Sequence, residues 1–509
     1  MRLSKLLAFF VAVGTAVLPL VLVPGPAQAA TCAAPFRYAA TSNRIYVTGA
    51  TTPVTPTAIR EGCSSAPLEL VDPASKTWQL NAEIQLEAGS TLNLHGGPGG
   101  DVETLRLRSG SAGTLAEVVS ITAEYGTISI KDTTITSWDP ATGAADTDAN
   151  IPGGGVRGRA FIRALSILEG NTPRTSTMDI VNSDLGYLGF FGPESYGVAY
   201  KAKGCGVDTP AVCESLGVLG KQIGSKFHHN FMGTYTWGAD GMEFSGNEYF
   251  SNISYGLDPH DDSDNLVIKN NKMYDNGNHG LICSQRCDHL IITDNEVTNN
   301  GHIPYVAPGD PNPTDNQVHG IMLHRGISDS IVKNNTVRGQ ITGAGIAIFD
   351  SVGNTVEGNT VSGNKFGLRF SAGSRGTVVS GNTVTDSSLH ALFAYKGNDP
   401  AIYTGTSGRP SDIVFDGNTF TGSGAELIKL QDADRFTLKG GQIGGTMALG
   451  PLFERAQGHV FEATVSTPAG TNFTLGGTAA VKTDVTFAGM KADAIAVTKD
   501  AHSTATFTG

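Results

Sequence analysis

The seven-residue segment 255–261, YGLDPHD, contains a phenol, two carboxylates and an imidazole. Successive side chains of a strand point to opposite faces, so Asp258 and His260 should share one face and their neighbours the other. An imidazole titrates near neutral pH and can take up or return a proton during catalysis. The segment therefore predicts an acid–base site on one surface of a strand.

A short asparagine-containing phrase recurs around this segment, and its spacing identifies the scaffold. Successive members are separated by 24, 24, 40, 24, 23 and 36 residues. A fixed period of this size predicts a solenoid, with roughly 16 and 12 additional residues in its two longer turns. The recurring asparagines are Asn247, Asn271, Asn295, Asn335, Asn359, Asn382 and Asn418.

The residue types between the asparagines indicate strands. Val, Ile, Thr and Phe dominate, residues 78–94 alternate apolar and polar side chains, and no amphipathic segment is long enough for a helical repeat. Each coil should therefore consist of short strands and turns, with asparagine side chains stacked inside it. The predicted fold class is all-β, a parallel β-helix with about 24 residues per coil.

Aligning the coils on their glycines gives columns that run along the solenoid, about 4.8 Å per coil. The two columns expected in the core are Leu257, Leu281, Ile321, Ile346, Leu368 and Pro259, Cys283, Leu323, Ile348, Phe370. The two polar columns expected on one outer face are Tyr255, His279, His319 and His260, Ser284, His324, the second extended by Lys201 and Trp237.

Two cations and a long insertion fall beside the same face. Arg286 and Arg325 follow the polar column, and residues 302–317 form an insertion rich in Pro and Asp. Long loops of this kind are often functional, so the insertion is predicted to wall a groove. An Asp-Pro pair can merely start a turn, and a surface histidine can merely be solvated. The gathering of several such residues on adjacent coils favours the functional interpretation.

Four segments resemble mannuronan C5-epimerases, most closely their periplasmic single-domain branch. The segments are YGLDPHDDSDNLVIKNN at 255–271, TSWD at 136–139, ESYGVAY at 194–200 and HGIMLHRGISDS at 319–330, and the likeness covers most of residues 76–400. The first contains the family motif Tyr-Gly-x-Asp-Pro-His-Asp/Glu in the expected structural setting. The resemblance implies a right-handed β-helix that inverts C5 of uronate residues within a polymer, converting β-D-mannuronate to α-L-guluronate.

The same resemblance implies roles for individual residues. His260 and Tyr255 would be the base and acid on opposite faces of the sugar ring, in an order that the sequence leaves open. Asp258 would orient or tune them, and Arg325 would neutralise the substrate carboxylate, without which the C5 proton is barely acidic. The expected substrate-binding residues are Lys201, Trp237, His279, Ser284, Arg286, His319 and His324.

One coil departs from the family pattern. In the periplasmic branch the coil after the motif carries His-Gly-x-x-x-Ser-Arg, whereas this chain has HGLICSQR, with Gln285 in the arginine position and Arg286 one residue later. The pattern returns one coil on, with Arg325. An additional coil would thus separate motif and arginine, changing the subsite spacing or the polyuronate that is bound.

Three functions remain open from the sequence. The first is a polyuronate C5-epimerase, the second a polysaccharide lyase that abstracts the same proton and then expels the 4-O substituent, and the third a non-catalytic carbohydrate-binding β-helix. No cofactor and no metal site is expected, and the Gly-Gly-x-Gly-x-Asp runs of calcium-binding repeats are missing after residue 400. The expected partner is an anionic polysaccharide. The net charge of −12 argues against nucleic acid or an anionic membrane.

The beginning of the chain is typical of an exported protein. Basic residues, an apolar run and Ala27-Gln28-Ala29 predict a signal peptide over 1–29, and hence a secreted, extracellular monomer; a retained anchor is the alternative. Local disulfides are expected for Cys32 with Cys63, Cys205 with Cys213, and Cys283 with Cys287, although sequence does not fix the pairing. Zinc binding is disfavoured by their spacing. The expected organisation is an N-terminal cap at 30–75, the catalytic β-helix at 76–435 and capping strands at 436–509.

Overall fold

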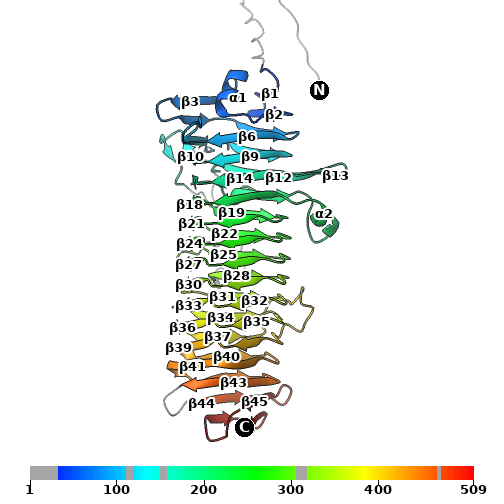
Figure 1. The fold of residues 1–509 in the computed structure, drawn as a ribbon, viewed down its shortest axis with the longest axis vertical. Helices are drawn as coiled ribbons and strands as arrows, with labels where there is room; N and C mark the ends of the chain where they lie inside the picture. The colour runs from blue at the N-terminus through cyan, green and yellow to red at the C-terminus, as the bar shows by residue number, and fades with distance from the viewer. Residues whose placement is uncertain (1–31, 111–117, 149–157, 305–317, 467–471) are drawn as a thin grey trace, which may run out of the picture.

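The computed structural model describes residues 32–110, 118–148, 158–304, 318–466 and 472–509. These ranges form one elongated stack of strand-built coils (Figure 1). The predicted signal peptide and all but the first residues of the insertion at 302–317 lie outside the described ranges. Within those ranges, no helix is long and apolar enough to cross a membrane.

Each regular coil contributes three short strands, and strands of successive coils pair in parallel. The predicted right-handed parallel β-helix is confirmed. The strands of one face, called the site face below, are β12 (Phe161–Glu169), β16 (Gly197–Ala202), β19 (Met232–Trp237), β22 (Leu257–His260), β25 (Leu281–Ser284), β28 (Ile321–His324), β31 (Ala344–Phe349), β34 (Phe366–Ser371), β37 (His390–Ala394) and β40 (Ile428–Gln431).

The other two faces carry shorter strands, because Gly, Asn or Asp turns interrupt them every few residues. On one face lie β17 (Leu219–Ile223), β20 (Glu243–Ser245), β23 (Val267–Lys269), β26 (Ile291–Thr293), β29 (Ile331–Lys333), β32 (Thr355–Glu357), β35 (Val378–Ser380) and β38 (Val414–Asp416). On the other lie β18 (Lys226–His228), β21 (Glu248–Phe250), β24 (Lys272–Tyr274), β27 (Glu296–Thr298), β30 (Thr336–Arg338), β33 (Thr360–Ser362), β36 (Thr383–Ser387) and β39 (Thr419–Glu426).

The two predicted apolar columns form the core of the coils. Leu257, Leu281 and Ile321 are fully buried and directly paired along the axis. The seven recurring asparagines form a continuous internal ladder, in which each side-chain amide donates to the next asparagine Oδ1 over 2.8–3.0 Å. The ladder satisfies polar groups that would otherwise be buried without partners.

The ends of the stack continue these columns. At the N-terminus β1 (Phe36–Ala39) pairs antiparallel with β2 (Arg44–Thr48), which pairs in parallel with β5 (Glu83–Glu87). Parallel pairing persists through the described parts of 436–509, which are 436–466 and 472–509, to β46 (Ala496–Lys499) and β47 (Ser503–Thr508). Helix α1 (Pro56–Gly62) belongs to the N-terminal end, and α2 (Pro210–Ser215) lies on a loop that projects from the side of the stack (Figure 1).

Two of the three expected cysteine pairs are disulfides, Cys32–Cys63 and Cys205–Cys213. The expectation for Cys283 and Cys287 is wrong, since both are free thiols and fully buried. Cys283 occupies the core column of β25, where it packs as a small hydrophobic residue. Burial also raises the pKa of each thiol, which keeps both protonated.

The longer turn between Asn382 and Asn418 doubles back along the stack. Its residues 396–409, called the return segment below, follow β37 and run beside the turns that end the site-face strands of earlier coils. Tyr403 of this segment reaches the turn after β25, and its neighbour Thr404 binds Asp350 after β31. The segment therefore ties several coils together next to the polar columns.

Candidate active site

The second predicted polar column exists as a register of paired residues on the site face. Along the axis Lys201 pairs with Trp237, Trp237 with His260, His260 with Ser284, and Ser284 with His324. Side chains of one strand face repeat with a period of two, and the parallel pairing carries them from coil to coil. The alignment of these five residues in one column, which was predicted from the sequence, is therefore confirmed by their strand pairing.

His260 lies at the centre of this column and is held from two sides. Its Nδ1 atom lies 2.5 Å from Asp261 Oδ2, and its ring stacks on Trp237 with centroids 5.5 Å apart. Burial alone would lower the pKa of His260, but the contact of its Nδ1 with the accepting carboxylate of Asp261 and the charges of Asp258 and Asp261 raise it above the ordinary value. With Nδ1 engaged, Nε2 is the nitrogen left for a substrate proton.

Asp261 is itself fixed by a cation. Its other oxygen, Oδ1, accepts a charge-assisted hydrogen bond from Arg286, and this carboxylate is only 4% exposed. Arg286 also binds Asp262 through Nε at 3.1 Å and through a second nitrogen at 2.9 Å. Arg286 was expected to bind substrate carboxylates, but its guanidinium is already paired with two aspartates of this chain. Its position suits support of His260 through Asp261.

Asp258 is the most deeply buried acid of the site, with 1% exposure. It shares a face of β22 with His260, as predicted, and follows Tyr235 of β19 in register. Burial raises the pKa of its carboxyl to about 6, although His260 and Ser284 act in the opposite direction. Its Oδ1 has no hydrogen-bond partner among the described residues. An unsatisfied buried acceptor of this kind is costly unless a ligand supplies a donor.

Tyr255 belongs to the first predicted column, which the structure shows as a stack of rings. Tyr255 lies over His279 with centroids 5.4 Å apart, and His279 over His319 at 5.3 Å. Burial, and then the charge of Asp258, raise the pKa of Tyr255. Tyr255 therefore keeps its proton at neutral pH and is suited to act as an acid.

The two histidines of this stack are neutral hydrogen-bonding groups. The Nδ1 atom of His279 accepts from the backbone N–H of His319 at 2.7 Å, and the Nδ1 atom of His319 accepts from the backbone N–H of Ala344 at 2.8 Å. Burial lowers the pKa of His279 to about 4 and that of His319 well below its ordinary value. Burial likewise lowers the pKa of His324 to about 3, and the charge of Arg325 adds to this effect.

The remaining predicted cations differ in how they are engaged. Lys201 is paired with Glu194 and lies 4.2 Å from the ring centroid of Trp237. Arg325 follows His324 in the turn after β28 and is half-buried, and its side chain makes no hydrogen bond or ion pair with any described residue. Arg325 is therefore the predicted cation that stays available to a substrate carboxylate.

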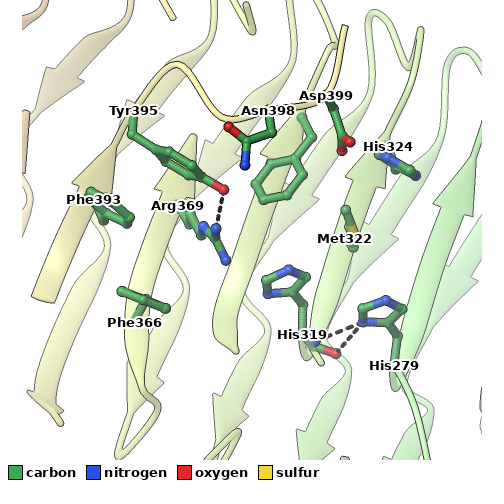
Figure 2. A pocket seen from close by; sticks show the side chains of 11 residues that line it. His279, His319, Met322, His324, Phe366, Arg369, Phe393, Tyr395, Asn398 and Asp399 are labelled. Atoms are coloured by element: carbon green, nitrogen blue, oxygen red, sulfur yellow. Dashed lines mark hydrogen bonds between the residues drawn. The ribbon is translucent and has the colours of Figure 1, made fainter. Parts of the chain in front are cut away.

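A pocket of about 480 Å³ opens where the two polar columns continue past the motif (Figure 2). His279, His319 and His324 line one side, and the hydroxyl of Tyr395 is bonded to the guanidinium of Arg369 on the other. Arg369 is 3% exposed and lies against four aromatic rings, at 4.7–5.8 Å from their centroids. The rest of the lining is Met322, Phe349, Phe366, Phe393, Asn398 and Asp399.

Several residues of the site were missed by the sequence interpretation. Asp261 was noted only as a second carboxylate, and Arg369 lies outside the columns that were considered. Burial raises the pKa of Tyr196 and of Tyr235, and the charge of Asp258 adds to this effect for both phenols, after that of Glu194 in the case of Tyr196. Tyr235 precedes Trp237 by two residues, so the alternation that placed Trp237 in the polar column was the signal that could have revealed it.

The grouping with metal-like spacing in the described ranges is Cys205, Cys213 and Asp262. The two cysteines are joined in a disulfide, so they offer no thiolate to a metal ion. The polar groups of the site are instead the imidazole of His260, which is held by a carboxylate, together with phenols and a guanidinium. These groups suit proton transfer at a carbon next to a carboxylate.

Fold and site together define a right-handed parallel β-helix protein that gathers an imidazole, carboxylates and phenols on one face. The family description "Right handed beta helix region" matches residues 220–320, and "Periplasmic copper-binding protein (NosD)" matches residues 309–407. The chain is similar to mannuronan C5-epimerases, which confirms the resemblance found in the sequence.

The individual matches are partial. The chain is 29% identical to mannuronan C5-epimerase AlgG of Azotobacter vinelandii over 188 residues, which are 36% of this chain and 30% of that protein. It is 29% identical to the mannuronan C5-epimerase of Pseudomonas fluorescens over 155 residues, 30% of this chain and 26% of that one. The match thus spans less than a third of either relative. The crystal structure of the periplasmic alginate epimerase AlgG superposes with a TM-score of 0.61 at 19% identity, covering 83% of this chain and 85% of that one.

Proposed function

We propose that this protein is a polyuronate C5-epimerase, acting on β-D-mannuronate or a related uronate within a polysaccharide. The observation that carries the proposal is the arrangement on β22: Asp258 and His260 share one face, and Asp261 engages Nδ1 of His260 so that Nε2 is left for the substrate. The similarity to mannuronan C5-epimerases supports the same reaction class.

In the proposed reaction His260 Nε2 takes the C5 proton, and the C5–H electron pair moves into the neighbouring carboxylate to give an enolate-like intermediate. Arg325 neutralises that carboxylate, because the C5 proton is hardly acidic while the carboxylate charge stands uncompensated. A proton then returns to C5 from the opposite face. Tyr255 is the proposed donor, since its raised pKa keeps its hydroxyl protonated at neutral pH.

Asp258 is proposed to bind the reacting sugar. Its unsatisfied Oδ1 would accept a hydroxyl of the substrate, and its charge adds to the proton affinity of His260. Lys201, Trp237 and Ser284 would contact the polymer along the column, and the neutral histidines His279, His319 and His324 would donate hydrogen bonds at the neighbouring pocket. Coil spacing of about 4.8 Å gives the polymer repeated contacts along the axis.

The test is the fate of C5 in deuterated water. Wild-type protein incubated with polymannuronate should place deuterium at C5 of inverted residues, as read by NMR, without shortening the chain. His260→Ala should reduce this incorporation by about 10² to 10⁴, the usual effect of removing a general base. Unsaturated chain ends, detected by ultraviolet absorbance without inversion, would make the protein a lyase. If the protein binds polyuronates but neither inverts nor cleaves any of them, it is a carbohydrate-binding module.

A further inference from the structure

The return segment, residues 396–409, is firmly docked on the turns beside the site face. The backbone N–H and the hydroxyl of Thr404 both donate to Asp350 Oδ1 at 2.9 Å, and the backbone N–H of Tyr403 donates to Asp350 Oδ2 at 3.0 Å. Asp350 is 1% exposed, so these charge-assisted bonds form away from solvent. Tyr403 is therefore held at a defined place on the stack.

The ring of Tyr403 packs on Gly326, in the turn after β28. A Cβ atom at Gly326 would lie 2.8 Å from the Tyr403 ring, and the φ of Gly326 is +79°, so only glycine leaves the space that the ring needs. The Tyr403 hydroxyl then donates to Gln285 Oε1 at 3.1 Å and accepts from a terminal nitrogen of Arg286 at 3.2 Å. Gln285 and Arg286 are the two residues at which this chain departs from the family pattern.

These contacts complete a chain of hydrogen bonds and one close imidazole–carboxylate contact that ends at His260. Tyr403 binds one terminal nitrogen of the Arg286 guanidinium, Asp262 binds Nε and the other terminal nitrogen, and that second terminal nitrogen also binds Asp261. Asp261 in turn binds Nδ1 of His260. A residue 143 positions after His260 thus contributes to fixing its ring.

We propose that Tyr403 is a positioning residue for His260, acting through Arg286 and Asp261. This inference rests on the proposed function only for the catalytic role of His260, because the hydrogen-bond chain itself needs no substrate. Without the Tyr403 hydroxyl, Arg286 loses one of its anchors and can withdraw from Asp261. The negative charge of Asp261 would then be less neutralised by Arg286 and would act more strongly on His260.

The charges that face His260 determine the sign of the effect. Asp258 and Asp261 raise the pKa of His260, and Arg286 lowers it. Tyr235 and His324, the other titratable neighbours, stay neutral at pH 7, because burial raises the pKa of the phenol and lowers that of the imidazole. Loosening Arg286 should therefore raise the pKa of His260.

The deciding measurement is an NMR titration of His260 in the full-length protein with labelled histidine, assigned with His260→Gln. Tyr403→Phe, which keeps the ring on Gly326, should move this titration upward by on the order of half a pH unit. Arg286→Met should move it further in the same direction. The acid limb of the kcat–pH profile should shift upward with the His260 titration, which gives roughly a threefold loss of activity at pH values below the His260 pKa.

Tyr274→Phe is the matched control, because it removes a hydroxyl that donates to Glu248 at 2.9 Å on another face. It should leave the His260 titration in place. An unchanged titration in Tyr403→Phe, even with a lower melting temperature, would overturn the proposal. A shifted titration in a protein with no epimerase activity would uphold the positioning role and reject the proposed function.

Discussion

The imidazole of His260 lies stacked on the indole of Trp237, with ring centroids 5.5 Å apart and planes inclined by 21°. The two residues are direct partners in the parallel pairing of β19 and β22. Lys201 lies 4.2 Å from the centroid of the same indole. Trp237 therefore connects a cation of the column to the proposed base.

Replacing Trp237 by Leu should lower kcat about fivefold, since an aromatic pair contributes about 1 kcal/mol beyond the area that it buries. The loss should appear in kcat because the ring supports His260 in its reactive orientation. Steady-state kinetics on polymannuronate would separate the possibilities. An increase in KM at constant kcat would show that Trp237 binds sugar and does not support the base.

Asp258 should make stability depend on pH. Burial raises its pKa from 3.8 to about 6, so between these values the native protein binds a proton that the unfolded chain has released. The stabilising effect of that proton is complete below pH 3.8 and is lost as pH rises through about 6. Asp258→Asn should remove this dependence and raise the free energy of unfolding at pH 7 by at most about 3 kcal/mol.

Denaturant unfolding of wild type and Asp258→Asn across this pH range tests the expectation. The same variant should lose most epimerase activity, because the amide cannot supply the negative charge that raises the pKa of His260. Parallel stability curves for the two proteins would show that Asp258 is ionised throughout, and that burial does not hold its proton.

Arg325 should be needed for catalysis and dispensable for folding. Its side chain has no hydrogen-bond or ion-pair partner within the described ranges, so Arg325→Leu should leave the melting temperature close to that of wild type. Turnover should fall by about 10² to 10³, the cost of losing charge stabilisation in the transition state. Arg338→Leu is the control, since Arg338 is exposed and paired with Glu296 on another face. Unchanged kinetics in Arg325→Leu would indicate that another cation of the site, such as Lys201, binds the substrate carboxylate.

The columns of the site face were predictable because they follow from two periodicities, alternation within a strand and about 24 residues between coils. The role of Asp261 was not. Strand alternation would turn Asp261 toward the core, like Pro259, but β22 ends at His260 and the chain turns, with Asp262 at a φ of +53°. The contact of Tyr403 with Arg286 was equally hidden, because it joins residues 117 positions apart through a loop with no repeat.

The free thiols Cys283 and Cys287 show the opposite failure. Their proximity in sequence suggested a disulfide, yet the glycine alignment had already placed Cys283 in the core column. Packing in that column was the stronger indication, since the alternation along β25 fixes where the Cys283 side chain points. The coil geometry should have taken precedence over cysteine spacing.

The asparagine ladder has a direction. Every amide in it, from Asn247 to Asn382, donates to the coil on its C-terminal side. Each of these amides also donates to a backbone carbonyl of the preceding coil, and the last member, Asn418, keeps this backward bond, to the Val379 carbonyl, without a following asparagine in the ladder. A stack that ends at any earlier coil therefore exposes amide donors, and the next coil to be synthesised brings the matching acceptor. We expect the ladder to favour the addition of coils in order from the N-terminus, because each new coil supplies the acceptor for the amide before it.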